Sequence, residues 1–183
     1  MTRRTRLLAV AAITVLTALV TGSVAKADEG ADFQGGVFFL RERLGGFAEN
    51  PSLSTTGSGQ FRAQVNERTQ EITYTLSYAG LEGPVTQAHI HFGQKWQNAG
   101  ISVFLCSNLG NGPAGTQACP EAPATITGTI RAADVIGPAA QGIAAGEFAE
   151  LLAAIRAGVA YVNVHSMLYP GGEIRAQLEH DHH

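Results

Sequence analysis

Residues 86–93 read TQAHIHFG, and the alternation in this stretch decides the fold class of the chain. Side chains of a β-strand point alternately to opposite faces, so the alanine, isoleucine and phenylalanine of this stretch are expected to share one face. Because these residues are apolar, their face is the one that packs on a core. His89 and His91 share the other face, and we expect both imidazoles to point outward to solvent.

Similar strand signals recur along the chain between clusters of turn-forming residues. Residues 146–158 interrupt them with apolar side chains at helical spacing and predict one short helix in a connection between strands. Short, regularly spaced strands predict an all-β domain, either a sandwich or a barrel. The expected strands are residues 33–40, 59–65, 71–78, 87–92, 101–105, 125–131, 159–165 and 173–178.

The first 27 residues have the composition of a secretory signal peptide. A basic start is followed by an apolar stretch, residues 7–20, and by the small-residue cleavage pattern Ala25-Lys26-Ala27. We expect cleavage after Ala27 and a secreted or periplasmic protein. An N-terminal membrane anchor is the alternative, for which the apolar stretch is short.

Cleavage would change the charge of the chain. It takes four of the 12 basic residues and none of the 15 acidic ones, which leaves eight basic residues and a formal net charge of −7. Nucleic-acid binding requires a basic footprint, so we expect no nucleic-acid partner. No further apolar segment is long enough to span a bilayer. Residues 28–178 are expected to form one domain, followed by a His-rich tail over residues 179–183.

The chain has two cysteines, Cys106 and Cys119. An even number of cysteines in an exported protein predicts a disulfide. The segment between them is rich in Gly, Asn and Pro, which predicts irregular structure that a cross-link would restrain. A thiolate metal site is the alternative.

A third histidine follows the same alternation in the stretch AYVNVHS, residues 160–166. Its two central valines would face the core, whereas Asn163 and His165 would point outward. If this strand neighbours the strand of residues 87–92, the imidazole of His165 joins the other two on one outer patch.

Three neutral imidazoles on one patch predict a metal site formed by His89, His91 and His165. Such a ligand set suits Cu(II) or Zn(II), and the Irving–Williams order favours copper, with zinc as the alternative. Three protein ligands also leave one coordination position open. Hydrogen bonds to the second ring nitrogen commonly orient such ligands, and we expect this role for Asn163, Tyr169 and Glu173.

Three segments of the sequence resemble the CHRD domain, a family named after chordin and widespread in bacterial secreted proteins. They are AHIHFG at 88–93, GISVFLCSNLGNG at 100–112 and YVNVHSMLYPGGEIRAQL at 161–178, and the similarity extends over about residues 33–178. Ala176 stands where the family more often has glycine. The resemblance implies an immunoglobulin-like β-sandwich and no particular biochemical activity.

The H-x-H pattern followed by glycine is also similar to the copper strand of Cu/Zn superoxide dismutase, a Greek-key sandwich. The sequence departs elsewhere, because it has no further histidine cluster for a bridging imidazole or a zinc loop. Signatures of nucleophile elbows, phosphate-binding loops and H-E-x-x-H metalloproteases are absent from the sequence. We therefore expect a metal-binding module. The alternatives are an interaction module for another exported protein and, third, a dismutase-like redox enzyme.

Overall fold

The computed structural model describes residues 36–179. The predicted signal peptide and the last four residues of the His-rich tail lie outside the described residues. Among residues 36–179, no helix is long and apolar enough to cross a membrane. The elements are β1 (Val37–Gly45), η1 (Gly46–Ala48), β2 (Ser58–Asn66), β3 (Glu71–Ala79), β4 (Val85–Phe92), β5 (Ile101–Ser107), β6 (Ala124–Ile130), η2 (Ala132–Asp134), η3 (Ala139–Gln141), α1 (Phe148–Arg156), β7 (Ala160–Ser166) and β8 (Ile174–Leu178).

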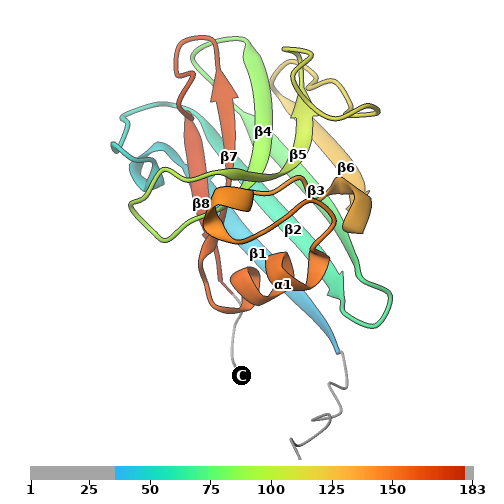
Figure 1. The fold of residues 1–183 in the computed structure, drawn as a ribbon. Coiled ribbons are helices and arrows are strands. Elements are labelled where there is room, and N and C mark those ends of the chain that lie inside the picture. The colour runs from blue at the N-terminus through green and yellow to red at the C-terminus, as the bar shows by residue number, and fades with distance from the viewer. Residues whose placement is uncertain (1–35, 180–183) are drawn as a thin grey trace, which may run out of the picture. The chain divides into compact units, whose positions relative to one another are not determined.

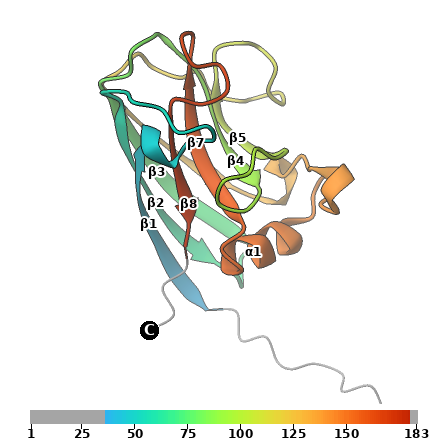
Figure 2. The ribbon, with the colours of Figure 1, turned by 90° about the vertical axis from the view of Figure 1, so that its left-hand side faces the viewer.

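All eight of these strands belong to one antiparallel sheet with the order β5-β4-β7-β8-β1-β2-β3-β6. The sheet is strongly curved, so that β4, β5 and β7 face β1, β2 and β3 across the interior (Figure 2). The all-β, sandwich-like class predicted from the sequence is confirmed. The structure adds that the two faces of the sandwich are parts of one nearly closed sheet.

The two edges of the sheet, β5 and β6, are linked by the segment between them. The predicted disulfide forms, and it joins Cys106 at the end of β5 to Cys119 with an S–S distance of 2.02 Å. Gln117 lies in the same segment. Its side-chain amide donates to the carbonyl oxygens of Leu105 on β5 (3.1 Å) and Thr127 on β6 (3.2 Å). One side chain therefore replaces part of the missing strand-to-strand ladder.

The core lies inside the curved sheet and consists of alternate residues of the strands. The expected helix forms as α1, which buries Phe148, Leu151 and Ile155 and contacts β7. Each such apolar side chain contributes about 1.5–3 kcal/mol on burial. An ion pair between Arg156 and Glu67 joins the end of α1 to the β2–β3 turn. The strand residues that are at most 1% exposed include Leu40, Phe61, Ile72, Leu76, Ile90, Val103, Leu105, Val162, Val164 and Ile174.

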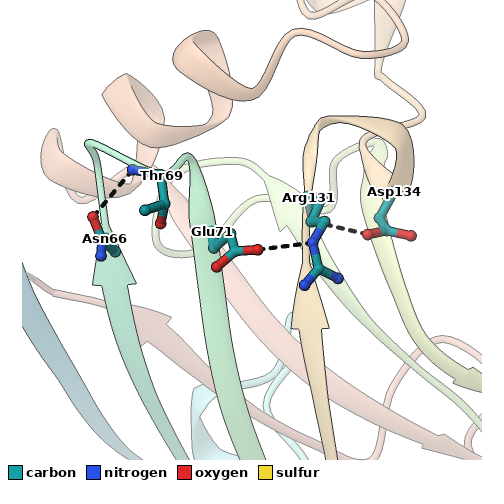
Figure 3. Close-up of polar contacts among 5 residues, drawn as sticks. All are labelled: Asn66, Thr69, Glu71, Arg131 and Asp134. Atoms are coloured by element: carbon teal, nitrogen blue, oxygen red, sulfur yellow. Dashed lines mark hydrogen bonds and ion pairs between the residues drawn. The ribbon is translucent and has the colours of Figure 1, made fainter.

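Polar contacts join the ends of β2, β3 and β6 (Figure 3). The side-chain oxygen of Asn66 accepts from the backbone N–H of Thr69 at 3.1 Å, a contact typical of asparagine in turns. An ion pair of 2.8 Å joins Glu71 on β3 to Arg131, directly after β6. The backbone N–H of Arg131 donates to Asp134 at 2.8 Å. These contacts hold the ends of neighbouring strands together.

The first strand departs most from its expected span of residues 33–40. Residues 33–35 lie outside the described part of the chain, and β1 continues to Gly45. Leu40 and Leu44 enter the core, whereas Arg41 and Arg43, which alternate with them, are exposed. Charged side chains next to isolated leucines obscure the apolar alternation in the sequence, so the end of this strand was predicted too early.

We expect the disulfide to contribute substantially to stability. A Cys106→Ala, Cys119→Ala double variant should lose about 3 kcal/mol of unfolding free energy, because the cross-link restricts the unfolded chain. Urea unfolding followed by circular dichroism measures the loss. The wild-type protein in reducing buffer is the control and should unfold like the variant. An unchanged urea midpoint in both would contradict the prediction.

Candidate metal site

The pairing of β4 with β7 brings the three predicted metal-ligating histidines together. In this antiparallel pair His89 lies opposite Asn163, and Gln87 lies opposite His165. The strands predicted to be neighbours are therefore adjacent in the sheet. One potential ligand atom from each of His89, His91 and His165 lies within 4.8 Å of the others. Such a group could hold a metal ion.

The three imidazoles are buried, so the expectation that they point outward to solvent is wrong. His89, His91 and His165 are only 0%, 7% and 5% exposed. They do lie on the side of the sheet opposite to the apolar core residues, but loops cover this side. The β4–β5 loop of residues 93–100 crosses in front of β7 and β8 (Figure 1). Alternation along a strand indicates the face of a side chain, whereas distant loops determine whether that face meets water.

A stack of three side chains holds the β4–β5 loop over the site. The Tyr161 ring lies parallel to that of His91, with 4.6 Å between ring centroids. The guanidinium of Arg175 lies 3.4 Å from the centroid of the Tyr161 ring. Arg175 also donates to the backbone oxygens of Gln97 (2.9 Å) and Gln94 (3.1 Å). The stack therefore orients one imidazole and fixes the loop that covers it.

Backbone carbonyls determine which ring nitrogens of two histidines carry the proton. His91 Nδ1 lies 2.9 Å from the oxygen of Ala99, and His165 Nδ1 lies 2.9 Å from the oxygen of Pro170. A carbonyl oxygen can only accept, so both Nδ1 atoms carry hydrogen and both Nε2 atoms keep a lone pair. His91 Nε2 is buried and has no hydrogen-bond partner among residues 36–179. His165 Nε2 lies 3.1 Å from His89 Nδ1.

Asn163 adds a further acceptor to this group. Its side-chain oxygen lies 3.0 Å from His165 Nε2. Its amide nitrogen lies beside Glu49, a carboxyl group that is only 3% exposed. The side chain of Asn163 therefore lies between the Glu49 carboxyl group and His165, with its oxygen placed toward the ring nitrogen.

Gly172 makes room for this arrangement. A Cβ atom at this position would collide with the Glu49 carboxylate and would lie 2.7 Å from the amide nitrogen of Asn163. The backbone of Gly172 also has a φ of +127°, which favours glycine. The glycine in the Pro-Gly-Gly turn therefore serves the packing of these two polar side chains.

Burial keeps the imidazoles neutral. It lowers the pKa of His89 to about 2 and that of His91 to about 4, and it lowers the pKa of His165 as well. Neutral rings are the form that binds metal ions. Burial has the opposite effect on an acid, and it raises the pKa of Glu49 to about 7 against the lowering effects of Arg175 and Asn163.

Of the three residues expected to orient the imidazoles, Asn163 reaches a ring nitrogen. The hydroxyl of Tyr169 instead donates to Glu82 at 3.0 Å. Glu173 is fully buried, and one of its oxygens accepts from the hydroxyl of Thr55 and from the backbone N–H of Glu82, both at 2.7 Å. These bonds join the β1–β2, β3–β4 and β7–β8 connections beside the site.

Two residues of the site, Glu49 and Arg175, were not anticipated from the sequence. Glu49 lies in a loop that follows η1, and no periodic pattern distinguishes it from a solvated acid. Arg175 follows the alternation of β8 and lies opposite Asn163. The alternation was therefore a usable signal for Arg175, although an outward arginine normally indicates a solvated face.

Comparison with known proteins identifies one family. The family model for the CHRD domain matches residues 42–178. No curated protein and no solved structure matches the chain.

The buried imidazoles predict a stability that falls with decreasing pH in metal-free protein. Between pH 6.5 and 4.5 unfolding adds a proton to His89 and to His91, and each contributes about 1.4 kcal/mol per pH unit. Glu49 releases a proton on unfolding in the same range and cancels one of these contributions. Lowered histidine pKa values thus outweigh the raised carboxyl pKa, and the unfolding free energy decreases as pH falls.

Urea unfolding at several pH values, in the presence of a chelator, measures this slope. A Glu49→Gln variant removes the opposing proton and should steepen the slope by about 1.4 kcal/mol per pH unit. Stability that is constant or that increases towards pH 4.5 would contradict the prediction.

Proposed function

The chain belongs to the CHRD domain family, and from its geometry we propose that it is a metal-binding module that holds one ion through His89, His91 and His165. Copper is the favoured ion and zinc the alternative. The module acts in storage, delivery or protection outside the cytoplasm.

The convergence of buried acceptor atoms is the observation that supports this proposal. His91 Nε2, His165 Nε2 and the side-chain oxygen of Asn163 all have lone pairs, and His89 can offer either of its ring nitrogens. A buried acceptor without a donor costs about 1–3 kcal/mol. A bound metal cation would satisfy several such atoms at once, because each would donate a lone pair to it. The site therefore offers lone pairs, as a cation site does, rather than the matched donors and acceptors of a hydrogen-bonded network.

The donor set supports the choice of metal. Neutral imidazoles suit copper and zinc, and Cu(II) stands above Zn(II) in the Irving–Williams order. Three histidines would leave one coordination position open, and the side-chain oxygen of Asn163, 3.0 Å from His165 Nε2, could serve as a further ligand. Carboxylate and carbonyl sites, by contrast, suit magnesium and calcium.

Burial supports binding in preference to turnover. The three rings are almost fully covered, and Arg175 and Tyr161 fix the loop above them. A redox enzyme of the dismutase kind needs repeated access of its substrate to the metal. The predicted signal peptide and the disulfide support an extracellular or periplasmic location.

Titration with metal ions tests the proposal directly. The mature chain, with His180, His182 and His183 changed to Ala, should bind one Cu(II) ion. Its affinity for Zn(II) should be lower. An ion at a hundredfold excess over its dissociation constant should stabilise the fold by about 2.7 kcal/mol. A His165→Ala variant should lose this stabilisation. An interaction module without a metal role would show no stoichiometric uptake, and superoxide turnover that is lost in His89→Ala would favour the enzyme alternative.

The role of Asn163 can be tested separately. An Asn163→Leu variant keeps the three histidines but removes the oxygen beside His165 Nε2, and its Cu(II) dissociation constant should rise about 10–100-fold. Gln177→Leu is a matched control, because Gln177 on β8 lies on the same face of the sheet as Asn163 on β7. Its side-chain amide donates to the backbone of Gly93 and Gly158. Equal affinities of the two variants for Cu(II) would show that Asn163 has no special role.

A further inference from the structure

A second polar surface lies on the outward face of β1, β2, β3 and β6. Figure 2 shows β1, β2 and β3 on the side of the molecule away from β5 and α1. Alternate residues of these strands enter the core, and the residues between them point outward. β1 and β2 present the exposed side chains of Arg41, Arg43 and Arg62. β3 and β6 continue this face with hydroxyl groups, those of Thr73, Thr75, Ser77, Thr125 and Thr127.

The three arginines repel one another in the unliganded protein. Arg41 and Arg62 are direct cross-strand partners, and Arg43 lies opposite Gln60, two residues along. Like charges in directly opposed positions destabilise an antiparallel pair. Among residues 36–179, the arginine ion pairs are those of Arg131 with Glu71 and of Arg156 with Glu67, so they do not relieve this repulsion.

The concentration of positive charge is unusual for this chain. These three arginines are three of the eight basic residues that remain after the predicted signal cleavage, in a chain whose expected net charge is then negative. Two carboxylates lie at or near the described part of this face. Glu71 is engaged with Arg131 (Figure 3), and Glu42, which lines one of the hollows described below, accepts from the backbone N–H of Glu179. The surface therefore has unsatisfied positive charge and suits an anionic partner.

Three hollows run across this face in a row. The largest, of about 620 Å³, is lined by Arg43, Gln60, Ser77 and Thr125 among others. The next, of about 190 Å³, shares Arg43 and Gln60 with it. The third, of about 210 Å³, shares Arg41 and Arg62 with the second. The row is therefore continuous, and an arginine lines each part of it.

We propose that this face binds an extended anionic polysaccharide. The planar guanidinium fork of arginine matches carboxylate and sulfate groups with two parallel hydrogen bonds. The surrounding threonine, serine and glutamine side chains can both donate to and accept from sugar hydroxyls. Phe39 lines the third hollow and is 58% exposed, so it offers an apolar surface to a sugar ring.

The observations favour a polysaccharide over the other anionic partners. A protein interface is expected to have a central cluster of apolar and aromatic anchors, whereas this face is polar through its middle. Membrane-surface binding is expected of an element that inserts an apolar side into the lipid headgroups, whereas this face is hollowed and belongs to a rigid sheet. The proposal is independent of the histidine site, which lies on β4 and β7.

Binding of the mature full-length chain to immobilised polygalacturonate tests the proposal, with dextran sulfate as the sulfated arm and neutral dextran as the uncharged one. An Arg41→Ser, Arg62→Ser variant should bind at least about tenfold more weakly, because two charge-assisted contacts are lost. Its melting temperature should stay the same or rise, since the repulsion between the two arginines is removed. An Arg68→Ser, Lys95→Ser variant changes the net charge equally at exposed positions outside the face and should bind like the wild type.

Three results would overturn the proposal. One is the failure of the wild type to bind either charged polysaccharide at low salt. Another is an equal loss of binding in the two double variants, which would show that only net charge matters. The third is tighter binding to poly-glutamate or to phosphatidylglycerol vesicles than to the polysaccharides, which would assign the face to a protein or to a membrane. A preference between polygalacturonate and dextran sulfate, lost in the Arg41→Ser, Arg62→Ser variant, would identify the anionic group that the face recognises and would support the proposal.

Discussion

The antiparallel pairing of β4 with β7 is the constraint on which the histidine site depends. Its register places His89 opposite Asn163 and Gln87 opposite His165, so that side chains about 75 residues apart in the chain share one small volume. A shift of one residue would turn every side chain of one strand to the other face. The apolar residues that alternate with the histidines oppose this shift, because it would place them among the polar groups of the site and bury the imidazoles in the apolar core.

Burial of both faces of these strands determines the chemistry of the site. All seven residues of β7 are buried, which means that the face opposite the core is covered as thoroughly as the core face. Part of this cover is the β4–β5 loop, which Arg175 holds through hydrogen bonds to two backbone oxygens. Polar groups under such a cover are desolvated, and this desolvation lowers the pKa values of the imidazoles and keeps the rings neutral. The same curved sheet keeps its other outward face open and positively charged on β1 and β2.

Much of the fold could be predicted because a β-strand imposes an alternating pattern on a short segment of sequence. All eight strands, α1 and the disulfide were anticipated, since alternation, helical spacing and cysteine number are properties of short segments or of simple counts. The boundaries of β1 were less predictable, because Arg41 and Arg43 interrupt the apolar pattern around Leu40 and Leu44. Glu49 could not be foreseen as part of the site, because its neighbour Asn163 is more than 100 residues away in the sequence and no local pattern connects them.

The sequence by itself determined that this chain forms strands, which side of each strand faces the core, and which three histidines lie on the other side. These properties follow from alternation, which is a geometric consequence of the extended backbone. Only the tertiary structure decided that the outer side of β4 and β7 is buried, that Asn163 presents an oxygen to the rings, and that Arg175 holds the cover in place. Burial and hydrogen-bond direction depend on which distant segments meet, and no local pattern encodes that.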